Sequence, residues 1–293
     1  MNMARLAKDS VFSVVIDVWD HSTFKADLRE VLVGHAELIR AYFDTEHSIF
    51  LSYDLGRDPD RPMLRPENPH ASAYYVLLNA VGELLAPCSI RAFHYTRLTD
   101  DEVADFRQSG IHLSTPETLR HRLDALVASG DLSADIANRL YDASPFHSDQ
   151  RDARSGKFWM VSHPIAIDYG GVEPLMKRWG GEVASFQLSD AALPAPLTRL
   201  GKARIIEIAV PLDATRQTPK ASEAMVATFG RSLGAIPDKS TFDLYVKTPL
   251  PASTVLAVHT EDEATFAAMG RTYPAGFVDV DVGRWKELTG EDD

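Results

Sequence analysis

The order of strand-like and helix-like segments after residue 88 constrains the fold of this chain more than any other feature of its sequence. Runs rich in β-branched and aromatic residues predict strands at Ile90–Tyr95 and Phe158–Ser162, and six further runs follow a similar pattern. Many of these predicted strands follow one another directly, without the helix of a regular βαβ repeat. The pattern therefore favours an α+β fold over a doubly wound sheet. The other predicted strands are Ile111–Leu113, Val183–Leu188, Ala203–Pro211, Phe242–Lys247, Thr254–Thr260 and Phe277–Val282.

Helical periodicity and capping residues predict the helices of the same part of the chain. Thr115 and Asp131 are suitable N-caps, and Pro116 suits the first helical position. Gly110 is expected to end the helix before it, because a residue without Cβ adopts the left-handed conformation at little cost. The predicted helices are Asp100–Gln108, Pro116–Ala128, Ser133–Tyr141, Val172–Trp179 (ended by Gly180-Gly181), Ala221–Leu233 and Glu263–Met269, with a loop at Phe146–Lys157.

Residues 1–88 are expected to form an N-terminal α/β subdomain or extension of unknown role, followed by a second domain at residues 89–293. Strands are predicted at Val11–Val18 and Ile49–Tyr53, and helices at Ala26–Phe43 and Ala71–Leu85. Gly56–Pro69 is rich in proline, which fixes φ and removes a backbone donor, so a loop is expected there.

Composition limits the environment in which this chain can work. Cys88 is the single cysteine, which excludes an intrachain disulfide and a thiolate-based zinc site, and fits a reducing compartment. The apolar run Val11–Val18 is too short to cross a bilayer, and no signal-peptide cleavage pattern follows it. We therefore expect a soluble, cytoplasmic protein without a membrane partner.

Net charge bears on the partners of the chain. The formal value is −12, which argues against general binding to nucleic acid or to anionic lipid. A local basic site is still compatible with this net charge, although three of the candidate residues for such a site also fit a solvated charged loop. The candidates are Arg91, Arg97, Arg151, Arg154 and Lys157, of which the last three form that loop.

Several motifs of known chemistry are absent from the sequence. It contains no G-x-G-x-x-G after a strand, no G-x-x-x-x-G-K-[ST], no H-E-x-x-H and no G-x-S-x-G. None of the ten histidines forms an i, i+4 pair, so no helix-borne metal site is expected.

One constellation remains, at Phe93-His94-Tyr95-Thr96 followed after 13 residues by Gly110-Ile-His-Leu-Ser114. It resembles the first motif of the ADP-ribosyltransferase superfamily, in which a strand ends in His-x-Thr or His-x-Gly and a Gly opens the next strand. The resemblance implies a split mixed or antiparallel sheet with flanking helices, and NAD as the substrate. It assigns His94 to the nicotinamide ribose, and Tyr95 and Thr96 to the pocket wall. A satisfied structural histidine is the alternative.

A second stretch, Lys157–Leu188, is similar to the middle motif of that family, whose aromatic side chains enclose the nicotinamide ring. Phe158 and Tyr169 have the spacing of the paired tyrosines in one branch, and Ser162 closes the same strand. The first position here is Phe, which still offers a π face, and Pro164 and Gly170-Gly171 depart from the pattern. The alternative is that the aromatic residues simply form the core and surface of a strand.

The third motif should supply an acid, because a carboxylate stabilises the oxocarbenium-like state formed when nicotinamide leaves ribose. The segment from Phe242 to Pro249 resembles it, with Asp243 where the family commonly has Glu. Glu207 is the reserve candidate and Glu182 the third, although Glu207 also fits a solvent-facing strand position. Arg91 or Arg97 is expected to meet the pyrophosphate, because guanidinium matches phosphate in a bidentate way.

The resemblance spans roughly residues 89–262 and implies NAD-dependent transfer of ADP-ribose to a protein, nucleic-acid or small-molecule acceptor, or to water. Two alternatives stay open at this stage. One is an RNA 2′-phosphotransferase-like enzyme on a related fold, against which the acidic balance argues. The other is a non-catalytic interaction or regulatory protein. The sequence specifies neither the acceptor nor the oligomeric state.

Overall fold

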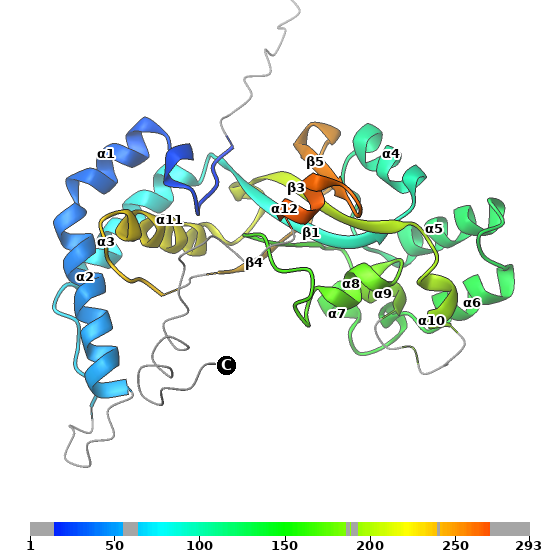
Figure 1. Ribbon diagram of the computed structural model, residues 1–293, viewed down its shortest axis with the longest axis horizontal. Coiled ribbons are helices and arrows are strands. Elements are labelled where there is room, and N and C mark those ends of the chain that lie inside the picture. The colour runs from blue at the N-terminus through cyan, green and yellow to red at the C-terminus, as the bar shows by residue number, and fades with distance from the viewer. Residues whose placement is uncertain (1–14, 55–63, 186–187, 189–192, 239–240, 270–293) are drawn as a thin grey trace, which may run out of the picture.

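The computed structural model describes residues 15–54, 64–185, 188, 193–238 and 241–269. Its centre is one open sheet of five antiparallel strands in the order β4-β2-β1-β3-β5, with helices packed around it (Figure 1). The prediction of a mixed α+β protein is therefore confirmed. The strands are β1 (Ser89–Leu98), β2 (Phe158–Val161), β3 (Lys202–Pro211), β4 (Asp243–Val246) and β5 (Val255–Thr260).

Strand register decides which side chains share a face of the sheet. β1 pairs with β3 over its whole length, whereas its registered pairing with β2 consists of Phe93 opposite Val161. Successive side chains of a strand point to opposite faces. Ile90, Ala92 and His94 therefore lie on one face, the first face, and Phe93 and Tyr95 lie on the other, the second face.

The first face carries the main hydrophobic core. Ile90 and Ala92 of β1 and Ile206 and Ile208 of β3 are fully buried there, in one cluster with apolar residues of four helices. This cluster also joins residues 16–85 to the sheet. The four helices lie at one end of the molecule in Figure 1 and are α1 (Ala26–Gly34), α2 (Ala36–Ile49), α3 (Ala71–Leu85) and α11 (Thr218–Ser232).

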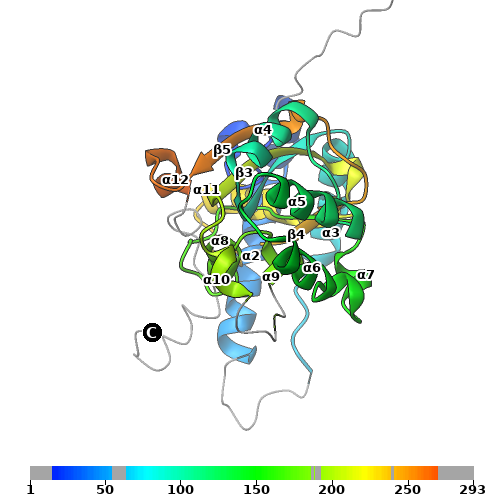
Figure 2. The same cartoon turned by 90° about the vertical axis from the view of Figure 1, so that its right-hand side faces the viewer.

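Other helices lie around the second face and at the opposite end of the molecule (Figures 1 and 2). Phe93, Tyr95 and Ile205 pack with Met176 and Phe266 on the second face. A separate apolar cluster surrounds the fully buried Trp179. α4 (Asp100–Ser109) also contributes Val103 to the main core. The remaining helices are α5 (Pro116–Ala128), α6 (Ala134–Asp142), α7 (Arg151–Arg154), α8 (Glu173–Lys177), α9 (Gly181–Ser185), α10 (Pro194–Leu197) and α12 (Ala264–Met269).

Helix ends with strong local signals were predicted well. α3 and α5 have the predicted bounds, and Thr115 caps α5 by accepting a hydrogen bond from the amide of Thr118. α4 ends at Gly110, whose φ is +91°. A Cβ at Gly110 would lie 2.1 Å from the carbonyl oxygen of Leu250, so this position requires glycine for its space as well as its backbone conformation.

Two predicted strands are wrong because short apolar runs fit a helix as well as a strand. Ile49–Tyr53 continues α2 to its end and then forms one π-helical turn, Phe50–Asp54. The described part of Val183–Leu188 begins within α9 rather than in a strand. Ile111–Leu113 is reduced to a single bridge between Ile111 and Leu250.

Other differences concern the bounds of elements. The helix expected at Ala26–Phe43 is interrupted at His35, and Ser133 rather than Asp131 caps α6. The loop expected at Phe146–Lys157 contains part of a 3₁₀ turn (Pro145–His147) and all of α7. Of Val11–Val18, Ile16 forms a parallel bridge with Ile90, and Phe277–Val282 lies outside the described residues. The remaining short turns are His21–Thr23, Leu212–Ala214 and Ala252–Thr254.

No helix in the described segments combines the length and the hydropathy that crossing a membrane would need.

Candidate functional site

A cavity of about 730 Å³ opens beside the junction of β1 and β2. Its walls come from both strands, from α4 and α5, from the loop before α8, and from the start of α9. Residues from all three predicted motifs line it, although they are up to about 150 positions apart in the sequence. These are His94, Tyr95, Thr96, Phe158, Tyr169, Glu182 and Asp243.

His94 is fixed in one tautomer by the backbone of β2. Its Nδ1 lies 2.8 Å from the carbonyl oxygen of Trp159 and must donate the hydrogen, since a carbonyl can only accept. Burial lowers the pKa of His94 to about 4, and the nearby charge of Arg122 lowers it further. The imidazole is therefore neutral at physiological pH, and its Nε2 is a hydrogen-bond acceptor.

Two aromatic residues of the second predicted motif, Phe158 and Tyr169, line the cavity. The ring of Phe158 lies 4.4 Å from the imidazole of His94, measured between centroids. Across the cavity wall, the side chain of Tyr169 is exposed at 61% and lies in the loop before α8. The hydroxyl of Tyr95 accepts a hydrogen bond of 2.6 Å from the amide of Ile165, which ties this loop to β1. Burial raises the pKa of Tyr95 to about 12, so it remains a neutral phenol.

Asp243 begins β4 opposite Val161 and therefore lies on the second face, whereas His94 lies on the first. The cavity lining thus includes residues from both faces of the sheet. The cavity lies beside the place where Phe93 of β1 pairs with Val161 of β2. Partial burial raises the pKa of Asp243 above its ordinary value. The other candidate acid in the lining, Glu182, is held in an ion pair with Arg154.

The cations that line the cavity agree only in part with those expected from the sequence. Arg154 and Lys157 belong to the basic set noted in the sequence, and both line the cavity. Arg122 was missed. Its Nε donates to Glu102 at 2.6 Å, and its guanidinium lies 4.5 Å from the ring centroid of Trp179. A signal was present, because Arg122 lies beside the buried positions Leu119, Leu123 and Leu126 of a predicted amphipathic helix.

Arg91 and Glu207 lie outside the cavity lining and interact with each other. Register places Glu207 opposite Phe93 on the second face, where its carboxylate lies 3.2 Å from Nε of Arg91 and 2.9 Å from Nε2 of His259. Arg91 also faces Asp17, at 3.5 Å. Glu207 is 5% exposed and pairs with Arg91 and His259, so the solvent-facing alternative for this residue is wrong.

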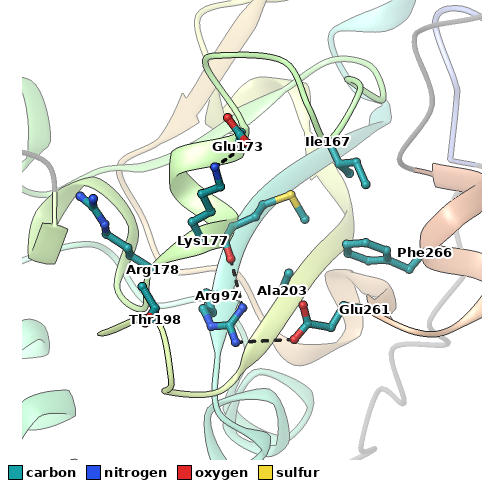
Figure 3. A pocket seen from close by; sticks show the side chains of 10 residues that line it. Arg97, Ile167, Glu173, Lys177, Arg178, Thr198, Ala203, Glu261 and Phe266 are labelled. Carbon is teal, nitrogen blue, oxygen red and sulfur yellow. Dashed lines mark hydrogen bonds and ion pairs between the residues drawn. The ribbon is translucent and has the colours of Figure 1, made fainter. Parts of the chain in front are cut away.

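Arg97 borders a different cavity, of about 530 Å³, on the second face (Figure 3). Its guanidinium donates to the carbonyl oxygens of Leu200 and Gly201 at 2.8 and 2.9 Å, and Figure 3 shows it turned toward Glu261, 3.6 Å away. Protein groups therefore already occupy its donors. Ser162 is also engaged elsewhere, because its fully buried hydroxyl accepts from the amide of Phe242.

Comparison with protein-family models, with curated proteins and with solved structures finds no match to this chain. Among the residues that the structure describes, no group of three or more His, Cys, Asp or Glu is arranged to hold a metal ion. The chemistry of the cavity depends on its own side chains. These supply a neutral imidazole acceptor, aromatic faces, guanidinium groups and a carboxylate of raised pKa.

Proposed function

We propose that this cavity binds NAD and that the protein transfers ADP-ribose from it to an acceptor, on a sheet of the ADP-ribosyltransferase type. The observation that carries the proposal is that His94, Phe158, Tyr169 and Asp243, selected from separate motifs, line one cavity. Its volume of about 730 Å³ falls in the ordinary range for small-molecule and cofactor sites.

In the proposed reaction, the bond between C1′ of the ribose and the ring nitrogen of nicotinamide breaks. Nicotinamide leaves with the bonding electron pair, which removes the positive charge of its ring and leaves positive charge on the ribose. The acceptor then forms a bond to C1′ and loses a proton. Water as the acceptor gives free ADP-ribose.

His94 and the aromatic residues would hold the reacting half of NAD. The unprotonated Nε2 of His94 suits a ribose hydroxyl, which can donate to it, while Nδ1 stays bound to the carbonyl of Trp159. The rings of Phe158 and Tyr169 offer faces for the nicotinamide ring. A neutral imidazole also adds no positive charge next to a ribose that becomes positive.

Asp243 would stabilise the developing cation and receive the proton of the acceptor. A carboxylate aimed at charge that forms in the transition state is a large contributor to catalysis. Partial burial raises the pKa of Asp243, which makes its carboxylate a better base than that of an ordinary aspartate.

The test is the release of nicotinamide from NAD by the purified full-length chain, measured with Asp243→Asn and with candidate acceptors. We expect release by the wild type and a loss of roughly 100- to 1,000-fold in the variant, the usual effect of removing such an electrostatic group. Asp101→Asn is the matched control, because Asp101 is an exposed carboxylate in the first turn of α4 and should leave the rate unchanged.

Release that is equal in wild type and Asp243→Asn would reject the role of Asp243. Absence of release with every acceptor class, together with absence of NAD binding by the folded protein, would reject the proposed function and favour a binding protein.

A further inference from the structure

The guanidinium of Arg122 is held in a fixed orientation by two neighbours. Its Nε donates to Oε1 of Glu102, and one of its faces lies against the indole of Trp179, which is fully buried. The other carboxylate oxygen of Glu102 accepts from the amide of Thr99 and from Nε1 of Trp179, both at 2.8 Å. The same contacts thus cap α4, join it to α5 and set the direction of the arginine.

One terminal nitrogen of this guanidinium, Nη2, lacks a hydrogen-bond partner among the described residues. Within the part of the chain that the structure describes, Nη2 of Arg122 is buried and makes no hydrogen bond. The side chain as a whole remains 28% exposed and lines the cavity. Buried polar groups in folded proteins nearly always have partners, so an orphaned charged donor beside a cavity indicates a ligand group that would complete it.

The other two cations of the cavity are already engaged. Arg154 pairs with Glu182, and Nζ of Lys157 donates to the carbonyl oxygens of Asp152 and Ala153. Arg122 also lies close enough to His94 for its charge to act on the imidazole. A ligand held at His94 therefore comes within the field of Arg122.

We infer that Arg122 binds the diphosphate of the nucleotide in this cavity, the role expected of Arg91 or Arg97 from the sequence. The two Nη groups form a fork that matches two oxygens of a phosphate, and such charge-assisted pairs are stronger than neutral hydrogen bonds. The inference rests on the proposed function in taking a dinucleotide as the ligand, and it assigns specificity for phosphate to α5 rather than to β1.

Calorimetric titration of the full chain with ADP-ribose and with adenosine tests this assignment. Adenosine is the matched probe, because it keeps the base and one ribose but lacks phosphate. We expect Arg122→Gln to weaken ADP-ribose binding by about 10- to 100-fold, the effect of losing a hydrogen bond to a charged group, and to change adenosine binding little. Arg120→Gln is the control, since Arg120 lies on the same helix but bonds to Asn138 and Asp124.

Folding of each variant is checked by its thermal midpoint, because Arg122 also joins α4 to α5. If Arg122→Gln does not fold, Arg122→Lys tests the inference instead, because lysine keeps the positive charge but lacks the two Nη groups. We then expect a smaller but clear loss of ADP-ribose affinity. Unchanged ADP-ribose affinity in a folded Arg122 variant would overturn the inference, as would equal wild-type affinity for ADP-ribose and adenosine. Binding that depends on Arg122 without nicotinamide release from NAD would reject the proposed function and leave the phosphate site standing.

Discussion

Protonation of His94 should destabilise the fold, and the structure gives the size of the effect. The pKa of His94 is about 4 in the folded protein, against an ordinary value near 6.5 in the unfolded chain. Between these values only the unfolded state binds the proton. Stability due to the neutral imidazole is therefore complete above about pH 6.5 and is lost as the pH falls toward 4.

The full difference corresponds to about 3 kcal/mol, and about 2 kcal/mol of it should be lost between pH 7 and pH 5. Urea denaturation of the wild type and of His94→Gln at these two pH values measures the effect. Glutamine does not titrate, yet its amide can still donate to the carbonyl of Trp159. The other titratable groups are common to both proteins, so the difference between their pH dependences isolates His94.

We expect the wild type to lose about 2 kcal/mol more than His94→Gln on going from pH 7 to pH 5. His35→Gln serves as the control, because His35 is an exposed histidine between α1 and α2, and it should behave like the wild type. Equal losses in the wild type and His94→Gln would show that the imidazole is not held neutral by burial. The acceptor role of its Nε2 would then fail as well.

Two further predictions concern the cavity wall and the turn that closes α4. Arg122→Gln should raise the pKa of His94, because the substitution removes a positive charge that disfavours the imidazolium. NMR titration of the His94 ring measures this pKa, and an unchanged or lowered value would contradict the prediction. Gly110→Ala should lower the free energy of unfolding by roughly 2–4 kcal/mol, from backbone strain and a clash with a carbonyl oxygen. Gly130→Ala should lower the free energy of unfolding by only about 1 kcal/mol, because Gly130 has a similar positive φ but open space where a Cβ would lie. Equal losses of stability for the two variants in urea denaturation would refute the steric part of this prediction.

Elements with a local signal could be predicted from the sequence, because their cause lies within a few residues. Thr115 and Pro116 specify the start of α5, and Gly110 specifies the end of α4. The strand predicted at Ile49–Tyr53 failed because its apolar residues suit either a helix or a strand, and α2 continues into it. That choice depends on what the segment packs against, which a single sequence does not show.

The residues of the candidate site also separate into those that a local motif predicts and those that depend on the fold. Motif order was enough to select His94, Phe158 and Asp243, which line one cavity in the fold. Whether a strand arginine reaches the cavity depends on its contacts in the fold, and Arg91 and Arg97 both have protein partners outside the lining of this cavity.

Arg122 depends on a contact between two helices. Its orientation comes from Glu102 of α4 and from Trp179, neither of which is near it in the sequence. Helical periodicity places Arg122 beside the buried positions of α5, but no local pattern encodes its contacts with Glu102 and Trp179, which only the fold shows.

A crystal structure of the protein with a non-hydrolysable NAD analogue tests the central claim most directly. We expect the nicotinamide ribose within hydrogen-bonding distance of Nε2 of His94, the nicotinamide ring beside Phe158, and the diphosphate at Arg122. An analogue bound only in the cavity around Arg97, or no bound analogue at saturating concentration, would contradict the account.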